Sequence, residues 1–321
     1  MNLNNYHIGY LIFILSLSAT SLFGQEVYNN NLKPYKVWQA KRVTVFNYNA
    51  VKLNKKIIKQ GLIDLFVSNN SKEYDVNGKI IKFISYNKFG GVDFVENYKY
   101  DPLYNLVERY LMNATTGDTV SKSLMYYKDT LLVKQLDYQL IIDTNILDSI
   151  VFKIDLIGER NYLYNSKKEL IQSEYKSFHT YPEKNIQIRY DYNELGKVIK
   201  IINSSFDSIE YIRKIEYNQK GNIILEKEFN SSGDLFSYRK LEYNETSELV
   251  KEQRKNSPID KEITYVYKYI GEDIVGIESI SETFKSNRKY EYLYDEFGNW
   301  IQRIEDNGGD SYVVTERKIE Y

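Results

Sequence analysis

Arg213-Lys214-Ile215-Glu216-Tyr217 returns as Arg239-Lys240-Leu241-Glu242-Tyr243, and again as Arg317-Lys318-Ile319-Glu320-Tyr321. The Tyr that ends each segment belongs to a longer series along this 321-residue chain. Recurrence at a fixed period of this size predicts a repeat protein, in which each unit is completed by its neighbours. The positions in this series, called slot tyrosines below, are Tyr74, Tyr100, Tyr127, Tyr164, Tyr192, Tyr217, Tyr243, Tyr269, Tyr294 and Tyr321.

The spacing of the slot tyrosines is close to 26 residues. From Tyr192 onward the steps are 25, 26, 26, 25 and 27 residues. The step from Tyr127 to Tyr164 is 37 residues and departs from the others. We therefore expect an inserted or lengthened hairpin between these two positions.

Each slot tyrosine is followed by a turn and then by an apolar pair. Asn or Asp usually comes directly after the Tyr, and Gly commonly follows, as in Tyr294-Asp-Glu-Phe-Gly-Asn-Trp-Ile301. Asn and Asp side chains can hydrogen-bond the backbone of a turn, and Gly supplies the positive φ. A second turn lies near the middle of the repeat, for example at 230–234. Each unit thus reads strand, turn, strand, turn, which is one β-hairpin per repeat.

The strands that lead to the slot tyrosines alternate with a period of two, which is typical of half-buried β-strands. Tyr211, Arg213, Ile215 and Tyr217 fall on one face, and Lys214 and Glu216 on the other. β-Branched and aromatic residues, including 32 Tyr and 14 Phe, favour strands over helices. We expect an all-β fold: an antiparallel meander of about twenty strands, arranged as hairpin repeats of about 26 residues, that forms a curled or spiral open sheet.

The turn and apolar pair resemble the YD or RHS repeat family, in particular the short exported repeat proteins of Bacteroidetes. The resemblance covers residues 73–321 and implies a long antiparallel β-ribbon that curls or spirals. Large members of the family enclose toxic C-terminal cargo or mediate contact with cells and carbohydrates. This chain is short and its repeats lengthen between Tyr127 and Tyr164, so we expect neither a C-terminal toxin region nor a role as a toxin shell. The family names no catalytic residue that could be carried over.

The start of the chain indicates export. Residues 1–24 contain no charged side chain and include an apolar run too short to span a bilayer, which predicts a secretory signal peptide cleaved after Gly24. An uncleaved anchor is the alternative. After cleavage we expect no membrane span, and a location in the periplasm, on the outer surface or outside the cell. Residues 25–72 are interpreted as an N-terminal β capping region that protects the first edge of the array.

Composition offers little for catalysis, cofactors or metals. The chain has no Cys, and outside the signal its one His is His179, so thiolate metal sites, the usual zinc sites and disulfides are excluded. Acidic pairs such as Glu272-Asp273 and Glu305-Asp306 lie next to turns, where solvated acids are common. Formal net charge is −1, from 43 basic and 44 acidic residues without a basic stripe, so we expect no nucleic-acid partner.

We therefore expect a non-enzymatic exported repeat protein that acts as a scaffold or interaction module of the cell envelope or cell surface, without cofactors, and with a protein or polysaccharide partner. A carbohydrate-binding module is the alternative, with an enzyme of unfamiliar site as a weaker one. In the carbohydrate alternative, exposed aromatic rings would stack on sugars. The candidate stacking residues are Tyr98, Tyr138, Tyr181 and Trp300.

Overall fold

The computed structural model describes residues 40–63, 69–143, 151–178, 185–206 and 208–321, all within one compact unit. The predicted signal peptide, residues 25–39 of the predicted capping region, His179 and Tyr181 lie outside the described residues. Within the described part, every regular element is a β-strand. This confirms the all-β prediction.

The first eleven strands are β1 (Arg42–Leu53), β2 (Lys56–Leu62), β3 (Asn69–Tyr74), β4 (Ile80–Tyr86), β5 (Val92–Tyr100), β6 (Leu106–Asn113), β7 (Thr119–Lys128), β8 (Leu131–Asp143), β9 (Val151–Tyr164), β10 (Leu170–Ser177) and β11 (Asn185–Tyr192). The other ten are β12 (Val198–Ser205), β13 (Ser208–Tyr217), β14 (Ile223–Asn230), β15 (Leu235–Tyr243), β16 (Leu249–Lys255), β17 (Ile263–Ile270), β18 (Asp273–Ile280), β19 (Lys285–Tyr294), β20 (Trp300–Asp306) and β21 (Ser311–Glu320).

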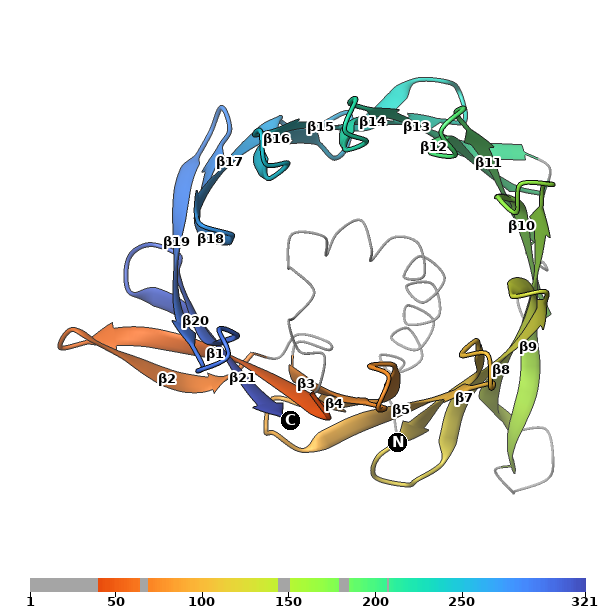
Figure 1. Ribbon diagram of the computed structural model, residues 1–321, viewed down its shortest axis with the longest axis horizontal. Helices are drawn as coiled ribbons and strands as arrows, with labels where there is room; N and C mark the ends of the chain where they lie inside the picture. The colour runs from red at the N-terminus through yellow and green to blue at the C-terminus, as the bar shows by residue number, and fades with distance from the viewer. Residues whose placement is uncertain (1–39, 64–68, 144–150, 179–184, 207) are drawn as a thin grey trace. The chain divides into compact units, whose positions relative to one another are not determined.

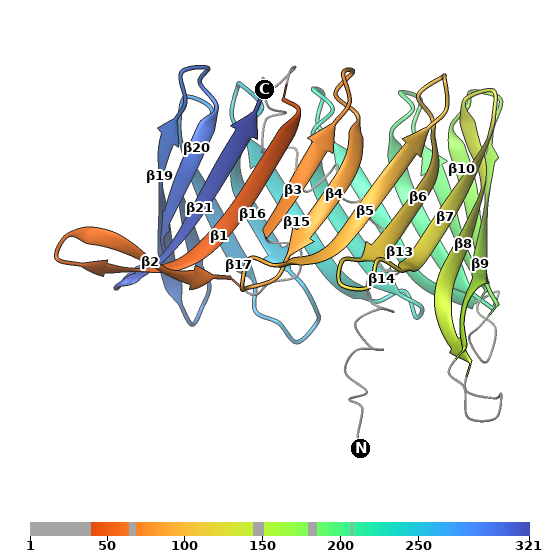
Figure 2. The same ribbon diagram turned by 90° about the horizontal axis from the view of Figure 1, so that it is seen from below.

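The sheet closes on itself. From β3 to β21 each strand pairs antiparallel with the next, and β1 joins the two ends: Arg42–Val51 pairs with β21 and Arg42–Val45 with β3. The result is a 20-strand antiparallel β-barrel built from β1 and β3–β21. Figure 1 shows the strands as a closed ring, and Figure 2 shows them slanting across its wall. β2 pairs only with the far end of β1, and this hairpin projects from the wall.

The prediction of an open, curled or spiral sheet is therefore wrong. An open sheet leaves two rows of unpaired backbone groups at its edges, and barrel closure satisfies both. Here the edges of β21 and β3 are both paired with β1. β1 thus serves as the closing strand of the ring.

The predicted turns are confirmed. In the turn after Tyr294, Asp295 Oδ1 accepts the backbone N–H groups of Phe297 and Asn299 at 3.0 and 2.8 Å. The equivalent Asn or Asp does the same in turn after turn, for example Asn193. Gly298 has φ 78°, in the left-handed region where Gly is least strained. The Asx bond and the positive φ together reverse the chain within five residues.

Six of the slot tyrosines also link their repeat to the backbone of the preceding one. The Tyr217 hydroxyl donates to the carbonyl of Val198 at 2.8 Å, and Val198 opens the apolar pair of the previous unit. Tyr100, Tyr127, Tyr164, Tyr192 and Tyr269 make the equivalent bond to Ile80, Leu106, Leu132, Leu170 and Leu249. These hydroxyls thus bond the backbone of a neighbouring repeat within the wall.

A β-bulge accompanies the slot tyrosine in nine successive repeats. Beside Tyr217, for example, the register shifts so that Tyr217 pairs with Ile223 while Glu216 pairs with Leu225. A bulge bends its strand and increases the local twist. Repeated once per hairpin, it adds curvature of one sense around the ring. The same shift occurs beside Tyr74, Tyr100, Tyr127, Tyr164, Tyr192, Tyr243, Tyr269 and Tyr294.

The long step between Tyr127 and Tyr164 is a lengthened hairpin, as predicted. β8 has 13 residues and β9 has 14, the two longest strands of the described part. Their pairing runs from Lys134↔Asn161 to Asp143↔Val151. The additional residues extend the two strands without adding a strand to the ring.

Candidate functional site

The β1–β2 hairpin identifies the outer face of the barrel. It lies outside the ring of strands in Figure 1. Ile57 of β2 packs against a small apolar cluster formed by Ala50, Tyr312 and Val314. These three side chains therefore belong to the outer face, and the strand register assigns the other residues in turn.

The outer face carries exposed lysine and carboxylate side chains in rows that cross the strands. On β5–β7, Lys99 and Lys122 both approach Glu108 at 2.8 Å. Other outer pairs are Lys134–Glu159, Lys200–Asp191, Lys251–Glu242, Lys285–Glu278 and Lys59–Glu316. The predicted wet face with Lys214 and Glu216 is part of this surface. Exposed pairs of this kind contribute about 0–1 kcal/mol each to stability, so their main effect is to keep the surface hydrated.

The inner face is also polar, but most of its cations are arginines. Arg213 Nε donates to Glu228 at 2.9 Å, and the other carboxylate oxygen of Glu228 accepts from Ser237 at 2.7 Å. Equivalent pairs join Arg109 to Glu96, Arg239 to Glu226 and Arg288 to Glu305. The guanidinium group forms several directed hydrogen bonds and stacks on rings, which suits a crowded concave face better than an ammonium does.

Glu252 on β16 is the most buried carboxylate of this network, with its side chain 6% exposed. Its Oε1 accepts from Arg239 Nε at 3.0 Å and lies 3.9 Å from Arg254 Nη1. Its Oε2 accepts from the Tyr267 hydroxyl at 3.0 Å. Burial first, and then the charge of Glu252, raise the pKa of Tyr267. Glu252 therefore connects side chains from three adjacent strands, β15, β16 and β17.

Aromatic rings cover several inner arginines. Trp300 has the Arg317 guanidinium 3.5 Å from its ring centroid, and Arg303 lies 5.6 Å from the Tyr290 ring. The same arrangement joins Arg254 to Tyr265 at 4.7 Å. Cation–π contacts of this kind hold the guanidinium groups against the wall.

The candidate stacking residues are not brought together. Tyr98 lies on the inner face of β5, half-buried, and its hydroxyl donates to Glu96 at 2.6 Å. Burial and the Glu96 charge raise the pKa of Tyr98. Tyr138 lies on the outer face of β8, paired with Lys122, whereas Trp300 is an inner residue beneath Arg317. Tyr181 lies outside the described residues, and sugar stacking by these rings stays a prediction.

The two acidic pairs noted in the sequence do not form a pair of neighbouring free carboxylates in the structure. Glu305 and Asp306 lie on opposite faces of the sheet, and Asp273 is already hydrogen-bonded. Glu305 points inward and approaches Arg288, whereas its neighbour Asp306 is an outer residue paired with Tyr312. Asp273 accepts a hydrogen bond from the Tyr294 hydroxyl. Within the described ranges, no group of three or more His, Cys, Asp or Glu side chains could hold a metal ion. Likewise, no helix in the described part is long and apolar enough to cross a membrane.

The ring is too wide for its inner side chains to fill. Twenty strands about 4.8 Å apart, at the tilt usual for barrels, give a diameter of about 40 Å between opposite backbones. Barrels of 16 to 18 strands already enclose an aqueous channel. The inner face is therefore a wide polar surface on which arginine and carboxylate groups are presented.

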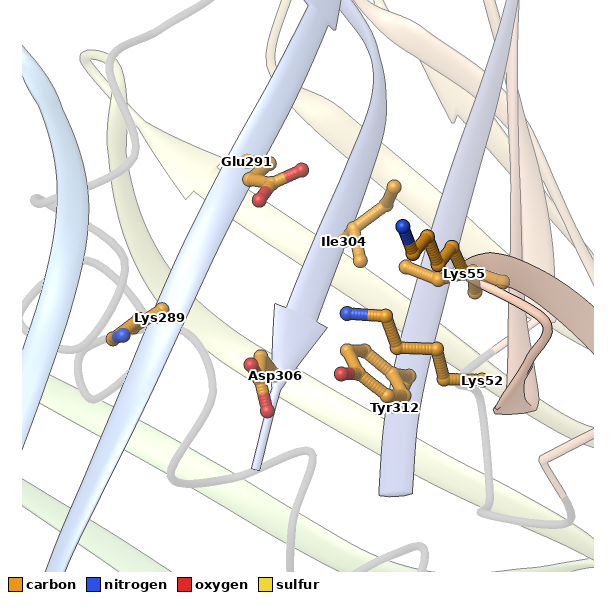
Figure 3. A pocket seen from close by; sticks show the side chains of 8 residues that line it. Lys52, Lys55, Lys289, Glu291, Ile304, Asp306 and Tyr312 are labelled. Carbon is orange, nitrogen blue, oxygen red and sulfur yellow. The ribbon is translucent and has the colours of Figure 1, made fainter. Parts of the chain in front are cut away.

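A smaller cavity of about 200 Å³ lies on the outer face beneath the β1–β2 hairpin. Lys52 and Lys55 line it from the hairpin side, and Glu291 and Asp306 from β19 and β20 (Figure 3). Because cations and carboxylates face one another across this space, their charges compensate within the cavity. We therefore regard the inner face as the candidate functional site.

No family model and no curated protein matches the sequence. Among solved structures, TcdB2-TccC3-Cdc42 is similar at a TM-score of 0.37 with 12% identity over 83% of this chain, which spans 18% of that chain. A porin-like protein from Bacteroides uniformis gives a TM-score of 0.36 with 10% identity, covering 88% of this chain and 98% of that one. A porin-like protein from Bacteroides vulgatus gives 0.29 with 12% identity and the same coverage.

Proposed function

We propose that this protein is an exported, non-enzymatic interaction module that stands in water and surrounds an extended polar ligand with its inner face. The observation that supports this best is the segregation of cations: arginines predominate on the inner face and lysines on the outer one, although Lys72 faces inward and Arg42 and Arg189 face outward. Arg213 and Lys214 are neighbours on β13 and illustrate the difference. Export is supported by the charge-free, apolar residues 1–24. The repeat motif also supports distant kinship with YD or RHS proteins.

The outer face favours water over a bilayer. Membrane barrels present an apolar band about 25 Å tall to lipid, and Lys at the bilayer midplane costs about 2–4 kcal/mol. Here Lys99, Lys122, Lys214, Lys240 and Lys251 all lie within outer rows of the wall. Five such residues would cost on the order of 10 kcal/mol, which is comparable with the whole stability of a typical domain.

The inner face favours a polar ligand over an apolar one. Its side chains offer guanidinium, carboxylate and hydroxyl groups held in place by neighbours, as in Arg213, Glu228 and Ser237. Groups with fixed orientation lose little conformational entropy when they bind, so their hydrogen bonds contribute more to affinity. A long chain with many polar groups could contact several such clusters at once.

The test compares two substitutions at adjacent positions. The full chain and its Arg213→Gln and Lys214→Gln variants are immobilised and exposed to envelope and culture-medium fractions of the source organism. Captured material is analysed for protein and for sugar. We expect the parent and Lys214→Gln to retain the same material and Arg213→Gln to retain less. Equal capture by both variants would refute inner-face binding, and flotation of the chain with liposomes would refute the aqueous location.

A further inference from the structure

Three polar side chains occupy neighbouring inner positions on β8, β9 and β10, the strands on the right of Figure 1. Arg160 of β9 pairs directly with Tyr175 of β10, and Asp137 of β8 pairs with Gly158, two residues before Arg160. Their register places them on the face opposite to Lys134, which forms an outer ion pair. We call Asp137, Arg160 and Tyr175 the β8–β10 polar cluster.

The ring of Tyr175 brings the members of this cluster together. It lies across β9, and its hydroxyl end rests on Gly158, where a Cβ would overlap it. The Arg160 guanidinium lies 5.2 Å from the ring centroid. Burial raises the pKa of Tyr175, the charge of Asp137 raises it further, and the charge of Arg160 opposes the shift. Both charges therefore lie close enough to act on one hydroxyl group.

Each member keeps hydrogen-bonding capacity that the described residues do not use. Asp137 is 7% exposed, and its Oδ1 accepts from Ser123 at 2.7 Å and from Gln135 at 2.8 Å. Within the described ranges, Asp137 Oδ2 and the Tyr175 hydroxyl have no hydrogen-bond partner, and Arg160 forms no ion pair. Arg160 Nε is buried and also without a partner there. The cluster thus presents an acceptor, a hydroxyl and a group of N–H donors side by side.

The charges of the cluster are balanced and already partly stabilised. Two hydrogen bonds stabilise the Asp137 carboxylate, and the Tyr175 ring stabilises the Arg160 guanidinium. One cation and one anion give no net charge, so the cluster does not attract a polymer of either sign. A neutral hydroxyl group suits these groups best, because it can donate to a carboxylate and accept from a neighbouring donor at once.

We propose that the β8–β10 polar cluster binds the hydroxyl groups of a neutral polysaccharide, which is the extended ligand of the inner face. One sugar hydroxyl donates to Asp137 Oδ2 and accepts from the Tyr175 hydroxyl, and a neighbouring sugar oxygen accepts from Arg160. In its polymer part this inference rests on the proposed function, whereas binding of sugar hydroxyls at the cluster does not.

The first experiment observes Tyr175 directly in the full chain. Tyrosines are labelled with 13C at Cζ, and the Tyr175 signal is identified by its absence in Tyr175→Phe. The neutral probes are oligosaccharides of glucose, galactose, mannose and xylose, and the charged probes are oligogalacturonate and triglycine. We expect at least one neutral probe to move the Tyr175 signal. A signal that only the charged probes move, or that no probe moves, would overturn the proposal.

The second experiment measures the affinity for the neutral probe by calorimetry. Tyr175→Phe should weaken binding about fivefold, because it removes one hydrogen bond and keeps the ring. Asp137→Asn should weaken it at least about tenfold, because it keeps the oxygen bonded by Ser123 and Gln135 but turns the unused oxygen into a donor. Thermal melting checks that each variant is folded.

Tyr126→Phe is the matched control for the loss of a hydroxyl. Tyr126 lies on the outer face of β7, paired with Lys134, and is 45% exposed. We expect this variant to bind the neutral probe as the parent does. Equal weakening by Tyr175→Phe and Tyr126→Phe would overturn the proposal, because the effect would then not come from the inner cluster.

The outcomes separate this site from the proposed function. If a polymer is captured through Arg213 while no probe moves the Tyr175 signal, the sugar site is refuted and the proposed function stands. If a neutral oligosaccharide moves the Tyr175 signal but the full chain captures no polymer, the site stands and the proposed function is refuted.

Discussion

Replacing Glu252 by Gln should destabilise the barrel more than any other single loss of a carboxylate in the inner network. The change removes the charge between Arg239 and Arg254 while keeping the volume of the side chain. Loss of one partner from a buried ion pair costs about 3–5 kcal/mol, because the other partner stays desolvated. Arg239 keeps Glu226 at 3.3 Å, and the Arg254 side chain is 35% exposed, so we expect the lower end, about 3 kcal/mol.

Thermal unfolding followed by circular dichroism measures this effect. The shift of the melting temperature per kcal/mol falls with size and is a little under about 2 °C for a unit that spans Gln39–Tyr321, so Glu252→Gln should lower it by about 5 °C. The matched control is Glu242→Gln on β15, because Glu242 is 44% exposed and pairs with Lys251 on the outer face. That variant should lose no more than about 1 kcal/mol. If both variants have the same melting temperature, the inner network is as hydrated as the outer rows, and our reasoning about burial is refuted.

Three further outcomes are expected. Ser247 has φ 67° at the same position of its turn as Gly298 in another repeat. Ser247→Gly should therefore raise the free energy of unfolding, measured with urea, by up to about 1 kcal/mol, and Gly298→Ser should lower it. Shifts of the same sign in both variants would contradict the turn assignment. Burial raises the pKa of Tyr192 and of Tyr269 to about 12, so the folded chain keeps these protons to a higher pH than the unfolded chain does. The contribution to stability should therefore be complete below about pH 10 and fall as the pH rises towards 12. A melting temperature that does not change over that range would contradict the burial of these hydroxyls. Deleting residues 218–243 should give a folded 18-strand barrel with normal β-type circular dichroism. Deleting β14 alone leaves an odd number of strands, so that β1 and β21 can no longer pair antiparallel. Cooperative melting of this second variant would contradict the closed antiparallel ring.

Much of the local structure could be predicted from the sequence because its causes are local. The Asn or Asp that follows most slot tyrosines, and the Gly that often stands four residues after the Tyr, determine a turn within one short segment. Period-two alternation placed Lys214 and Glu216 on a hydrated face, and the structure confirms this. The long step after Tyr127 correctly indicated the lengthened β8–β9 hairpin.

Closure of the sheet could not be predicted, because it depends on the curvature summed over all strands of the ring. Each bulge contributes a small bend, and its presence follows from how Tyr217 and its equivalents pair with the next strand rather than from their identity. Whether the accumulated bend leaves a spiral or a ring is decided by the meeting of Arg42–Val51 with Ser311–Glu320. These segments are far apart in the chain and carry no motif that marks them as partners.

The inner ion network was missed although a signal was present. The alternation that assigned Ile215 and Tyr217 to one face assigned Arg213 to it as well, and Arg239 repeats the position. An arginine that recurs in a half-buried column requires a partner in a neighbouring repeat. The partner Glu228 lies one strand away across a turn, and only the register identifies it.

The bond from most slot tyrosines to the preceding repeat has a consequence for how this kind of protein can change size. Since the hydroxyl of one unit reaches the backbone of the previous unit, whole hairpins are the smallest parts that can be gained or lost without breaking the chain of contacts. Each gain adds two strands, which at usual spacing and tilt widens the ring by about 4 Å. Duplication of a single repeat in the gene could therefore change the diameter of the ring in steps of two strands, to fit thicker or thinner ligands. The turns and wall contacts of the other repeats would stay the same.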